Sequence, residues 1–228
     1  MSDFVLPPLR PLAYAPPPGL PVIFADAHLL AVDKPSGLLT VPGRDPGLAD
    51  CVAARAEAAF PGARIVHRLD MDTSGVLVLA RTPEAQRHLG LQFERRHAAK
   101  LYEAVVAGLP EAEAGTVDLA LATDWPQRPR QRPDPAGRRA VTEWEVLART
   151  PEAPPRGAAR LALRPLTGRS HQLRAHLLAM GHPILGDALY ADEPAYTAAP
   201  RLMLHARRLG LRHPVGGAPL VLESPCPF

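Results

Sequence analysis

The chain has 228 residues, of which 46% are apolar and 21% are charged, and its net charge is +3. This is the composition of a globular protein, long enough for one large domain or two small ones. The two cysteines, Cys51 and Cys226, exclude a disulfide framework and favour the reducing cytoplasm. No apolar run approaches the ~18 residues of a membrane span, and the N-terminus lacks a signal-peptide pattern, so we expect no membrane partner.

The beginning of the chain predicts an arm followed by a β-hairpin. Residues 1–21 contain seven prolines and little charge, which is typical of an extended, poorly ordered segment. Two short apolar runs follow at residues 22–25 and 29–33, and they end in a loop that contains proline and glycine. We therefore expect a proline-rich arm over 1–21 and a hairpin directly after it.

Two helices are predicted on either side of a short apolar strand. Asp45 can cap the first helix, with Pro46 at its first position. Its apolar face would consist of Leu48, Val52, Ala56 and Phe60, before Pro61 and Gly62 end it. The second helix would begin at Thr82 and carry an apolar stripe made of Ala85, Leu89 and Phe93. Between them, "GVLVLA" is short and rich in Val and Leu, which predicts a fully buried strand.

The second half of the chain predicts more strands and one further helix. The strands are expected at residues 100–108, 140–148 and 158–166, within "RLMLHARRLGLRHP", and after a turn at Gly216 and Gly217. The helix is expected at 170–181, where Leu173 and Leu177 share a face and Gly181 ends it. This order predicts an α+β fold in which helices flank a mixed, largely antiparallel sheet.

A basic segment separates two of these strands. Residues 124–139 have four prolines and no apolar periodicity, and their arginines are Arg128, Arg130, Arg132, Arg138 and Arg139. A solvated surface loop is one interpretation. Arginines on a proline-stiffened loop also suit phosphate contacts, because the guanidinium group binds phosphate through two parallel hydrogen bonds.

Several familiar sites are absent from the sequence. There is no GxxxxGK[ST] or GxGxxG, no HExxH or cysteine pair, and no GxSxG. The sequence therefore disfavours a nucleotide-phosphate loop, a metal site and a serine hydrolase.

Ionisable residues gather just before the apolar strand, in "VHRLDMDTSGVLVLA". Asp70 and Asp72 lie there together with Arg68. A carboxylate in a partly dry pocket at the rim of a sheet can serve as a nucleophile or a base. Alternatively, Asp70 caps a turn and pairs with Arg68, and the residues alone do not choose between the two aspartates.

A second polar cluster lies in "PLTGRSHQLRAH". Arg169 stands at the start of the predicted helix, where its charge and the free N–H groups can bind an anion. His171 and Arg174 are three residues apart and share one helical face. The alternative is a capped surface helix with a solvated polar face.

Together these segments resemble the RluA-type pseudouridine synthases. The resemblance rests on "HRLDMDTSGVLVLA", "LTGRSHQLRAH" followed by "GHPILGDALY", "KLYEAVVAG" and "DKPSGLLTVPGR", and runs from about residue 21 to the C-terminus. "DWPQRPRQ" further resembles the RluA branch, which acts on large-subunit ribosomal RNA and on the anticodon stem-loop of certain tRNAs. Many relatives carry an N-terminal S4-like RNA-binding domain, which the short arm cannot form. The resemblance implies a pseudouridine synthase catalytic domain over 22–228, with an active-site cleft across the sheet.

The resemblance also implies roles for single residues. It places the essential aspartate at Asp70, whereas the second aspartate of the cluster falls on a position that the signature leaves free. It implies that Tyr102 lies against the target uracil and takes the proton from C5, and that Arg169 pairs with Asp70. It further suggests that Arg68 enters the RNA stack and that Leu204 forms an apolar wall of the pocket.

The implied reaction breaks the N1–C1′ bond of uridine, turns the uracil over and joins C5 to C1′. It needs neither a cofactor nor a metal, because nothing is added or oxidised. Two mechanisms stay open: the carboxylate attacks C1′ covalently, as in retaining glycosidases, or it removes a ribose proton to give a glycal. The arginines of 124–139 then become candidate RNA contacts, together with His171 and Arg174.

Two other functions compete with this interpretation. A nucleosidase would use the same carboxylate and release free uracil, and a non-catalytic RNA-binding protein would not need Asp70. A monomer is the default expectation for the oligomeric state.

Overall fold

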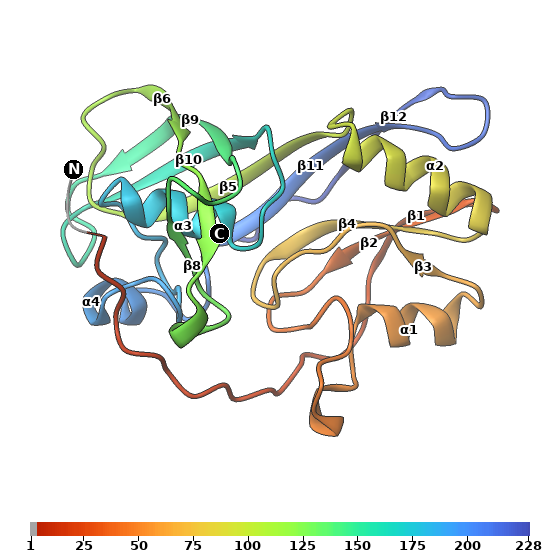
Figure 1. The fold of residues 1–228 in the computed structure, drawn as a ribbon, viewed down its shortest axis with the longest axis horizontal. Helices are drawn as coiled ribbons and strands as arrows, with labels where there is room; N and C mark the ends of the chain where they lie inside the picture. Colours follow the sequence, from red (N-terminus) through yellow and green to blue (C-terminus); the bar gives the residue numbers. More distant parts are fainter. Residues whose placement is uncertain (1–3) are drawn as a thin grey trace. The chain divides into compact units, whose positions relative to one another are not determined.

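The computed structural model describes residues 4–228, which divide into two compact units (Figure 1). Unit 1 contains residues 4–12 and Tyr102–Leu204, and unit 2 contains Ala13–Leu101 and His205–Phe228. The chain passes between the units at three points: between Leu12 and Ala13, and within the strands β5 and β11. Residues 22–228, predicted as one catalytic domain, therefore contain two compact bodies.

Unit 1 is built on an antiparallel sheet with the strand order β5-β10-β9-β6 and a separate pair, β7-β8. The strands are β5 (Ala99–Ala107), β6 (Ala114–Asp118), β7 (Leu121–Thr123), β8 (Gln131–Pro133), β9 (Val141–Thr150) and β10 (Ala158–Pro165). The helices are α3 (Gln172–Ala179), α4 (Glu193–Thr197) and the 3₁₀ turn η2 (Trp125–Gln127).

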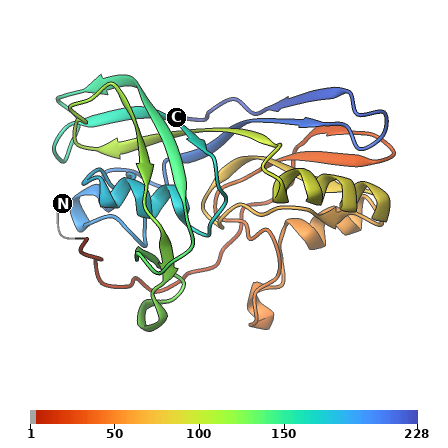
Figure 2. The ribbon, with the colours of Figure 1, turned by 45° about the horizontal axis from the view of Figure 1, so that its top comes forward.

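The core of unit 1 lies between this sheet and α3, which runs along one face of the strands (Figure 2). Leu161 and Leu163 of β10 belong to the same buried cluster as Leu173 and Leu177 of α3. Each buried leucine side chain stabilises the fold by roughly 1.5–3 kcal/mol. The predicted leucine face of α3 is therefore confirmed.

Unit 2 contains a mixed sheet with the strand order β1-β2-β4-β11, in which β12 pairs with β11 and β3 with β4. The strands are β1 (Val22–Ala25), β2 (Leu29–Lys34), β3 (Arg64–Ile65), β4 (Ser74–Ala80), β11 (Leu204–Arg212) and β12 (Pro219–Glu223). The helices are α1 (Val52–Ala59), α2 (Pro83–Glu94) and the 3₁₀ turn η1 (Pro46–Leu48). The pairing of β4 with β11 is parallel, whereas β2 and β3 run antiparallel to β4.

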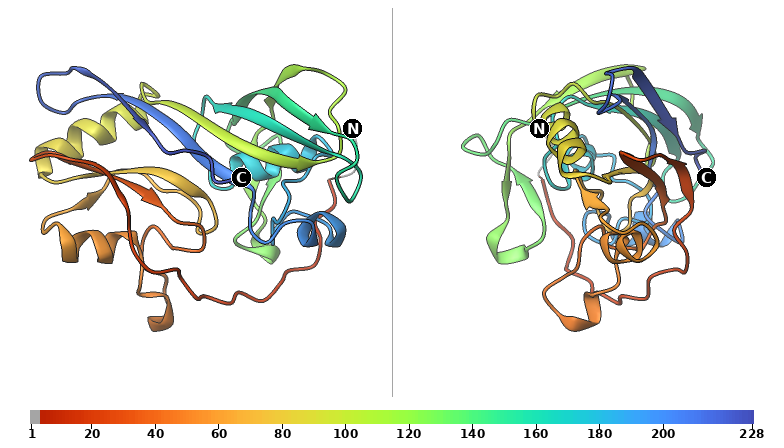
Figure 3. Two further views of the ribbon diagram at one scale, coloured as in Figure 1. Left: turned by 180° about the vertical axis from the view of Figure 1, so that it is seen from behind. Right: turned by 90° about the vertical axis from the view of Figure 1, so that its right-hand side faces the viewer.

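Strand β4 is buried along its whole length. The helices α1 and α2 lie on opposite sides of β2 and β4 (Figure 3), so both faces of these strands are covered. This explains why "GVLVLA" is a continuous apolar run without alternation. The buried strand predicted from that run is confirmed.

Most of the other predicted elements are also confirmed. The hairpin of β1 and β2, the helix capped by Thr82, and the strands expected near 100–108, 140–148 and 158–166 all occur. The fold class, a mixed and mostly antiparallel sheet flanked by helices, is confirmed as well. The elements β3, β6, β7 and α4 were not predicted from the sequence.

The prediction for the first helix was wrong in its extent. Asp45 caps only the short turn η1, and α1 begins later, at Val52 with Cys51 as its N-cap. The N–H groups of Val52 and Ala53 donate to the carbonyls of Leu39 and Thr40, at 2.8 and 3.1 Å. Because distant carbonyls satisfy its first N–H groups, tertiary contacts and not the local capping signal determine where the helix begins.

The basic segment is also more regular than predicted. Instead of an irregular loop, its first half forms η2 and β8, and β8 pairs with β7. We call residues 121–133 the basic hairpin. The arm was predicted over residues 1–21, of which 1–3 lie outside the described residues. Residues 4–21 contain no helix or strand, yet several of them contact the folded units.

Candidate active site

Asp70 lies in the loop that leads into β4, and hydrogen bonds hold the main chain on both sides of it. The residue before it, Leu69, donates its N–H to the hydroxyl of Thr40 at 3.3 Å and accepts that hydroxyl at its carbonyl at 2.7 Å. The carbonyl of Asp70 accepts the N–H of Thr73 at 3.2 Å. The carboxylate is thus carried by a short segment with a defined backbone.

A buried lysine holds the same loop from the other side. Lys34, at the end of β2, is 0% exposed. Its ammonium group donates to the carbonyls of Pro35, Leu38 and Met71 at 2.9, 2.6 and 2.7 Å. Met71 follows Asp70 directly, so a charged donor stabilises the peptide next to the candidate catalytic residue.

His67 joins the loop to β4 and α2. Its Nε2 accepts the N–H of Val78 at 3.0 Å, and its ring stacks on Phe93 with the ring centroids 4.3 Å apart. Burial lowers the pKa of His67 to about 3, and the nearby charge of Lys100 acts in the same direction. His67 is therefore neutral at physiological pH, with its proton on Nδ1.

The "TSG" part of the motif lies where β4 pairs with β11. Gly75 has a φ of +109°, and a Cβ atom there would collide with the carbonyl of Ala206. Ser74 lies 2.9 Å from Nδ1 of His205, whose Nε2 lies 3.0 Å from the carbonyl of Ser224. Because a carbonyl can only accept, His205 carries a proton on Nε2.

In unit 1, a buried network of neutral side chains holds the turn that carries Arg169. The Gln172 side-chain oxygen accepts the Thr167 hydroxyl at 2.6 Å and the Arg169 N–H at 3.0 Å. The Gln172 amide nitrogen donates to the Val141 carbonyl at 2.9 Å and to the Thr142 hydroxyl at 3.0 Å. The turn is thereby joined to the beginning of β9.

The network continues to His176 on α3. Its Nδ1 lies 3.0 Å from the Thr142 hydroxyl and its Nε2 lies 3.0 Å from the Leu119 carbonyl. Burial lowers the pKa of His176, and a neutral ring with its proton on Nε2 satisfies both contacts. Arg169 itself is only partly buried, and its Nε donates to the Arg139 carbonyl at 3.1 Å.

Tyr102 and Leu204 meet in the core of unit 1. Tyr102 lies on β5 opposite Leu163 of β10, and it packs against the cluster that contains Leu204. Tyr102 is partly buried, whereas Leu204 is 3% exposed. The predicted site residues are therefore divided between the units: the catalytic candidate Asp70 belongs to unit 2, whereas the catalytic candidates Tyr102 and Arg169 belong to unit 1, as does the predicted pocket-wall residue Leu204.

Comparison with known proteins decides which enzyme family these segments represent. The sequence model of the family described as "RNA pseudouridylate synthase" matches residues 28–179. The chain belongs to this family. It is therefore an isomerase that makes pseudouridine in RNA, as the four sequence motifs predicted.

Sequence relatives cover nearly the whole chain. The "Dual-specificity RNA pseudouridine synthase RluA" of Escherichia coli K12 is 48% identical over 94% of this chain and 98% of its own length. The proteins of the same name from Yersinia pestis and Haemophilus influenzae are 48% and 46% identical, over 91% and 95% of this chain and 99% of their own lengths. The resemblance to the RluA branch is confirmed.

Solved structures of the family share the fold. "Human RNA Pseudouridylate Synthase Domain Containing 1" is 26% identical with a TM-score of 0.77, and the match covers 96% of this chain and 87% of that one. "Human RNA Pseudouridylate Synthase Domain Containing 4" is 26% identical with a TM-score of 0.69, over 91% and 88%. These matches confirm the pseudouridine synthase fold.

Two of the predicted RNA contacts require correction. Arg174 is 3% exposed and binds Asp187 through two hydrogen bonds of 2.8 and 2.7 Å. Arg130 is 0% exposed and donates to the carbonyls of Pro7 and Pro8 and to Gln127. Both guanidinium groups are enclosed by protein, so neither can contact RNA directly in this conformation.

The other predicted RNA contacts remain accessible to different degrees. Arg68, Arg128, Arg132 and Arg138 are exposed. His171 is partly buried, and its Nδ1 lies 3.0 Å from the Tyr190 hydroxyl. The exposed arginines stay candidates for RNA binding.

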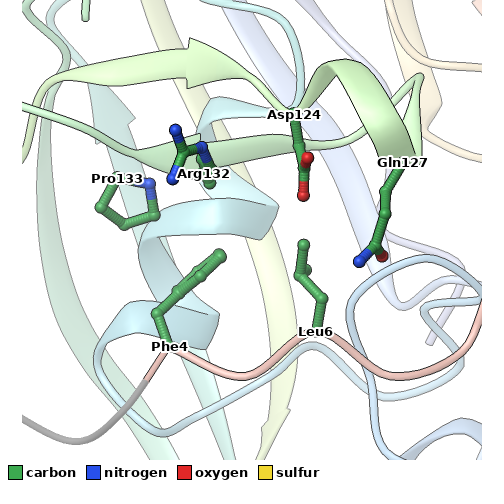
Figure 4. A pocket seen from close by; sticks show the side chains of 6 residues that line it. All are labelled: Phe4, Leu6, Asp124, Gln127, Arg132 and Pro133. Carbon is green, nitrogen blue, oxygen red and sulfur yellow. The ribbon is translucent and has the colours of Figure 1, made fainter. Parts of the chain in front are cut away.

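The arm lies directly against the basic hairpin. Figure 4 shows Phe4 and Leu6 of the arm facing Asp124, Gln127, Arg132 and Pro133 of the hairpin across a small hollow. Phe4 and Leu6 also pack against a buried cluster that contains Tyr190, whose hydroxyl accepts the N–H of Gln131 at 2.7 Å. The arm and Tyr190 therefore both contact the hairpin and help to fix its position within unit 1.

The residues that hold the candidate catalytic groups were not predicted from the sequence. Lys34, Thr40 and Gln172 were part of recognised motifs but received no role of their own. The position of Lys34 at the end of a largely apolar strand was the only local signal for it. The partners of Gln172 on β9 are about 30 residues away in sequence, and no local pattern indicates them.

Proposed function

We propose that this chain converts uridine to pseudouridine in unpaired loops of structured RNA, with Asp70 as the essential carboxylate. The observation that carries the proposal is the loop of Asp70, which Lys34 and Thr40 hold on both sides in a chain of this family. A carboxylate that must act on one sugar carbon requires a defined position, and these bonds provide it.

Asp70 acts in one of two ways. It attacks C1′ as a nucleophile and releases the uracil, or it removes a ribose proton to give a glycal; in both cases the uracil turns over before C5 joins C1′. Tyr102 supports the reaction by stacking its ring on the uracil and relaying the C5 proton through its hydroxyl. We further propose that Arg169 pairs with Asp70, as the resemblance implies.

The target uridine must leave the RNA stack to reach Asp70. Flipping a nucleotide costs a few kcal/mol and costs least in loops, which favours loop uridines as substrates. Arg68 would fill the space that the flipped nucleotide leaves. The exposed arginines Arg128, Arg132 and Arg138 would bind phosphate groups, and Leu204 would form an apolar wall of the pocket.

The relatives suggest the range of substrates. Because they are named dual-specificity RNA pseudouridine synthases, we propose that this chain also modifies two classes of RNA, large-subunit ribosomal RNA and tRNA anticodon stem-loops. We further propose that it works as a cytoplasmic monomer and that residues 22–228 constitute its catalytic domain. Among the described residues, no helix is long and apolar enough to cross a membrane.

The decisive experiment compares Asp70→Asn with Asp72→Asn. Pseudouridines are mapped in ribosomal RNA and tRNA from cells that lack the gene and carry the wild type or either variant. Asp70→Asn should behave like the deletion, with a rate at least about a thousandfold lower on a purified RNA stem-loop, whereas Asp72→Asn should restore the modification. A wild-type rate in Asp70→Asn would refute the role of this carboxylate. Release of free uracil by the wild type would instead favour the nucleosidase.

A further inference from the structure

The two tryptophans of the chain lie in opposite environments. Trp144 is 8% exposed and belongs to the core of unit 1, whereas Trp125 is 69% exposed at the tip of the basic hairpin. An indole ring is the largest apolar group that a protein can bury, and its burial normally stabilises the fold. Because the ring of Trp125 is mostly exposed, it contributes little stabilisation by burial. It is accessible to a binding partner.

A cation lies against this ring. The guanidinium carbon of Arg128 is 4.8 Å from the centroid of the Trp125 ring, within the range of a cation–π contact. Arg128 covers one face of the indole, and the high exposure of Trp125 leaves the other face accessible. A flat aromatic face beside a positive charge matches a nucleotide, which has an aromatic base and a negative phosphate.

The tip of the hairpin has a defined shape. The N–H of Asp124 donates to the Arg130 carbonyl at 3.0 Å, that of Gln127 to the Asp124 carbonyl at 3.0 Å, and that of Arg130 to the Gln127 carbonyl at 3.1 Å. The buried side chain of Arg130 then fastens the tip to the carbonyls of Pro7 and Pro8 in the arm. A platform held in this way loses little conformational entropy when a ligand binds.

We propose that Trp125 and Arg128 form a stacking platform for one unpaired nucleobase of the RNA substrate, separate from the uridine that reacts. The inference rests on the proposed function, because that function makes RNA the ligand. Positive surroundings favour this occupant over an apolar protein surface, since Arg132 and Arg138 are also exposed in this part of the chain. Stacking accepts any base, so the platform would add affinity for unpaired loops without reading their sequence.

The intrinsic fluorescence of the protein provides a direct test. In a Trp144→Phe background, Trp125 is the only tryptophan of the full-length chain. The probes are a synthetic RNA stem-loop with an unpaired loop and a fully paired duplex of the same composition. A stacked base should quench and shift the emission of Trp125 with the stem-loop, and much less with the duplex. A structural role of Trp125 would give no response to RNA.

Substitutions then measure the contribution of the platform. Trp125→Ala should weaken stem-loop binding about tenfold without changing its salt dependence, and Trp125→Phe should retain most of the affinity. Arg128→Gln should also lower the salt dependence, by about one phosphate contact. Thermal unfolding checks that the variants fold, and this is expected because both side chains are exposed.

The outcomes separate this inference from the proposed function. If the wild type makes pseudouridine while Trp125→Ala binds the stem-loop as tightly as the wild type and the emission is unchanged, the platform is refuted and the proposed function stands. An equal loss of affinity for duplex and stem-loop would also refute base stacking. If the wild type makes no pseudouridine, the proposed function fails. Quenching of the Trp125 emission by the stem-loop would then still support the platform, and an unchanged emission would refute it.

Discussion

The loop of Asp70 and the turn of Arg169 are positioned by different kinds of bonds. In unit 2, the ammonium of Lys34 makes three hydrogen bonds to carbonyls, one of them beside Asp70. In unit 1, neutral hydroxyl and amide groups around Gln172 and Thr167 share the same task. The loop of Asp70 depends mainly on one charged side chain, whereas the turn of Arg169 depends on several neutral side chains.

This difference determines how each segment should respond to substitution. Hydrogen bonds from a charged donor are roughly twice as strong as neutral ones, and a buried carbonyl that loses its donor keeps the full cost of desolvation. In a neutral network, the remaining members retain some of their partners. We therefore expect the Asp70 loop to be sensitive to one residue, and the Arg169 turn to be more tolerant.

The largest effect is expected from Lys34→Met. It removes the charged donor from three carbonyls and should lower the free energy of unfolding by about 3 kcal/mol. It should also lower kcat tenfold or more, because the peptide next to Asp70 is no longer held in place. Urea denaturation and the rate of pseudouridine formation on an RNA stem-loop measure the two effects.

Thr40→Val is the matched control, because it removes a neutral anchor of the same loop. It should cost about 1–2 kcal/mol. If Lys34→Met proved no more destabilising than Thr40→Val, the charged anchor would not be the stronger of the two.

A smaller effect is expected from Gln172→Leu. It leaves the Arg169 N–H and the Val141 carbonyl without their side-chain partner, while Thr167 and Thr142 retain other contacts. The free energy of unfolding should fall by about 2 kcal/mol, measured by the same urea method. Gln172→Glu keeps the hydrogen-bond acceptor but not the donor. Its free energy of unfolding should therefore lie between those of the wild type and Gln172→Leu. A loss as large as that of Lys34→Met would contradict the distributed network.

The smallest effect at neutral pH is expected from His67→Gln. The pKa of His67 is about 3 in the folded chain and near 6.5 when unfolded, so between these values only the unfolded state binds the proton. Stability should therefore fall as the pH falls from 6.5 toward 3, with a slope of up to about 1.36 kcal/mol per pH unit. His67→Gln should remove this contribution, as measured by urea denaturation over that pH range.

His213→Gln is a control with the opposite sign. The Val215 carbonyl and the carboxylate of Asp26 raise the pKa of His213. Its contribution to stability is present below pH 6.5 and is lost as the pH rises through the raised pKa.

Equal acid dependence of the free energy of unfolding in the wild type and His67→Gln would show that His67 is not the source of the slope.

Local sequence patterns were sufficient for most elements of the fold. The stripe of α2, the apolar run of β4 and the glycine after α3 each depend on residues only a few positions apart. The family motifs also predicted roles for Asp70 and Arg169, and these roles stay predictions. The elements that were missed are the short ones, such as β3 and β7, which have too few residues to show a period.

The arginines of the basic hairpin show the limit of such patterns. Arg128 and Arg130 stand two positions apart among the same prolines and polar residues, and their sequence contexts are nearly equivalent. In the structure, Arg128 lies on an exposed tryptophan, whereas Arg130 is buried against the arm. The carbonyls of Pro7 and Pro8, more than 120 residues away, accept hydrogen bonds from Arg130, and the local sequence does not indicate these partners.

The sequence by itself determined the family and the α+β class, because the motifs and periodicities that indicate them lie in neighbouring positions. Tertiary structure alone decided where α1 begins, which arginine is buried and how Lys34 reaches Met71. Each of these depends on hydrogen bonds between groups that are distant in the chain. Such groups come within hydrogen-bonding distance only after the core has formed, so no local sequence pattern indicates that they will pair.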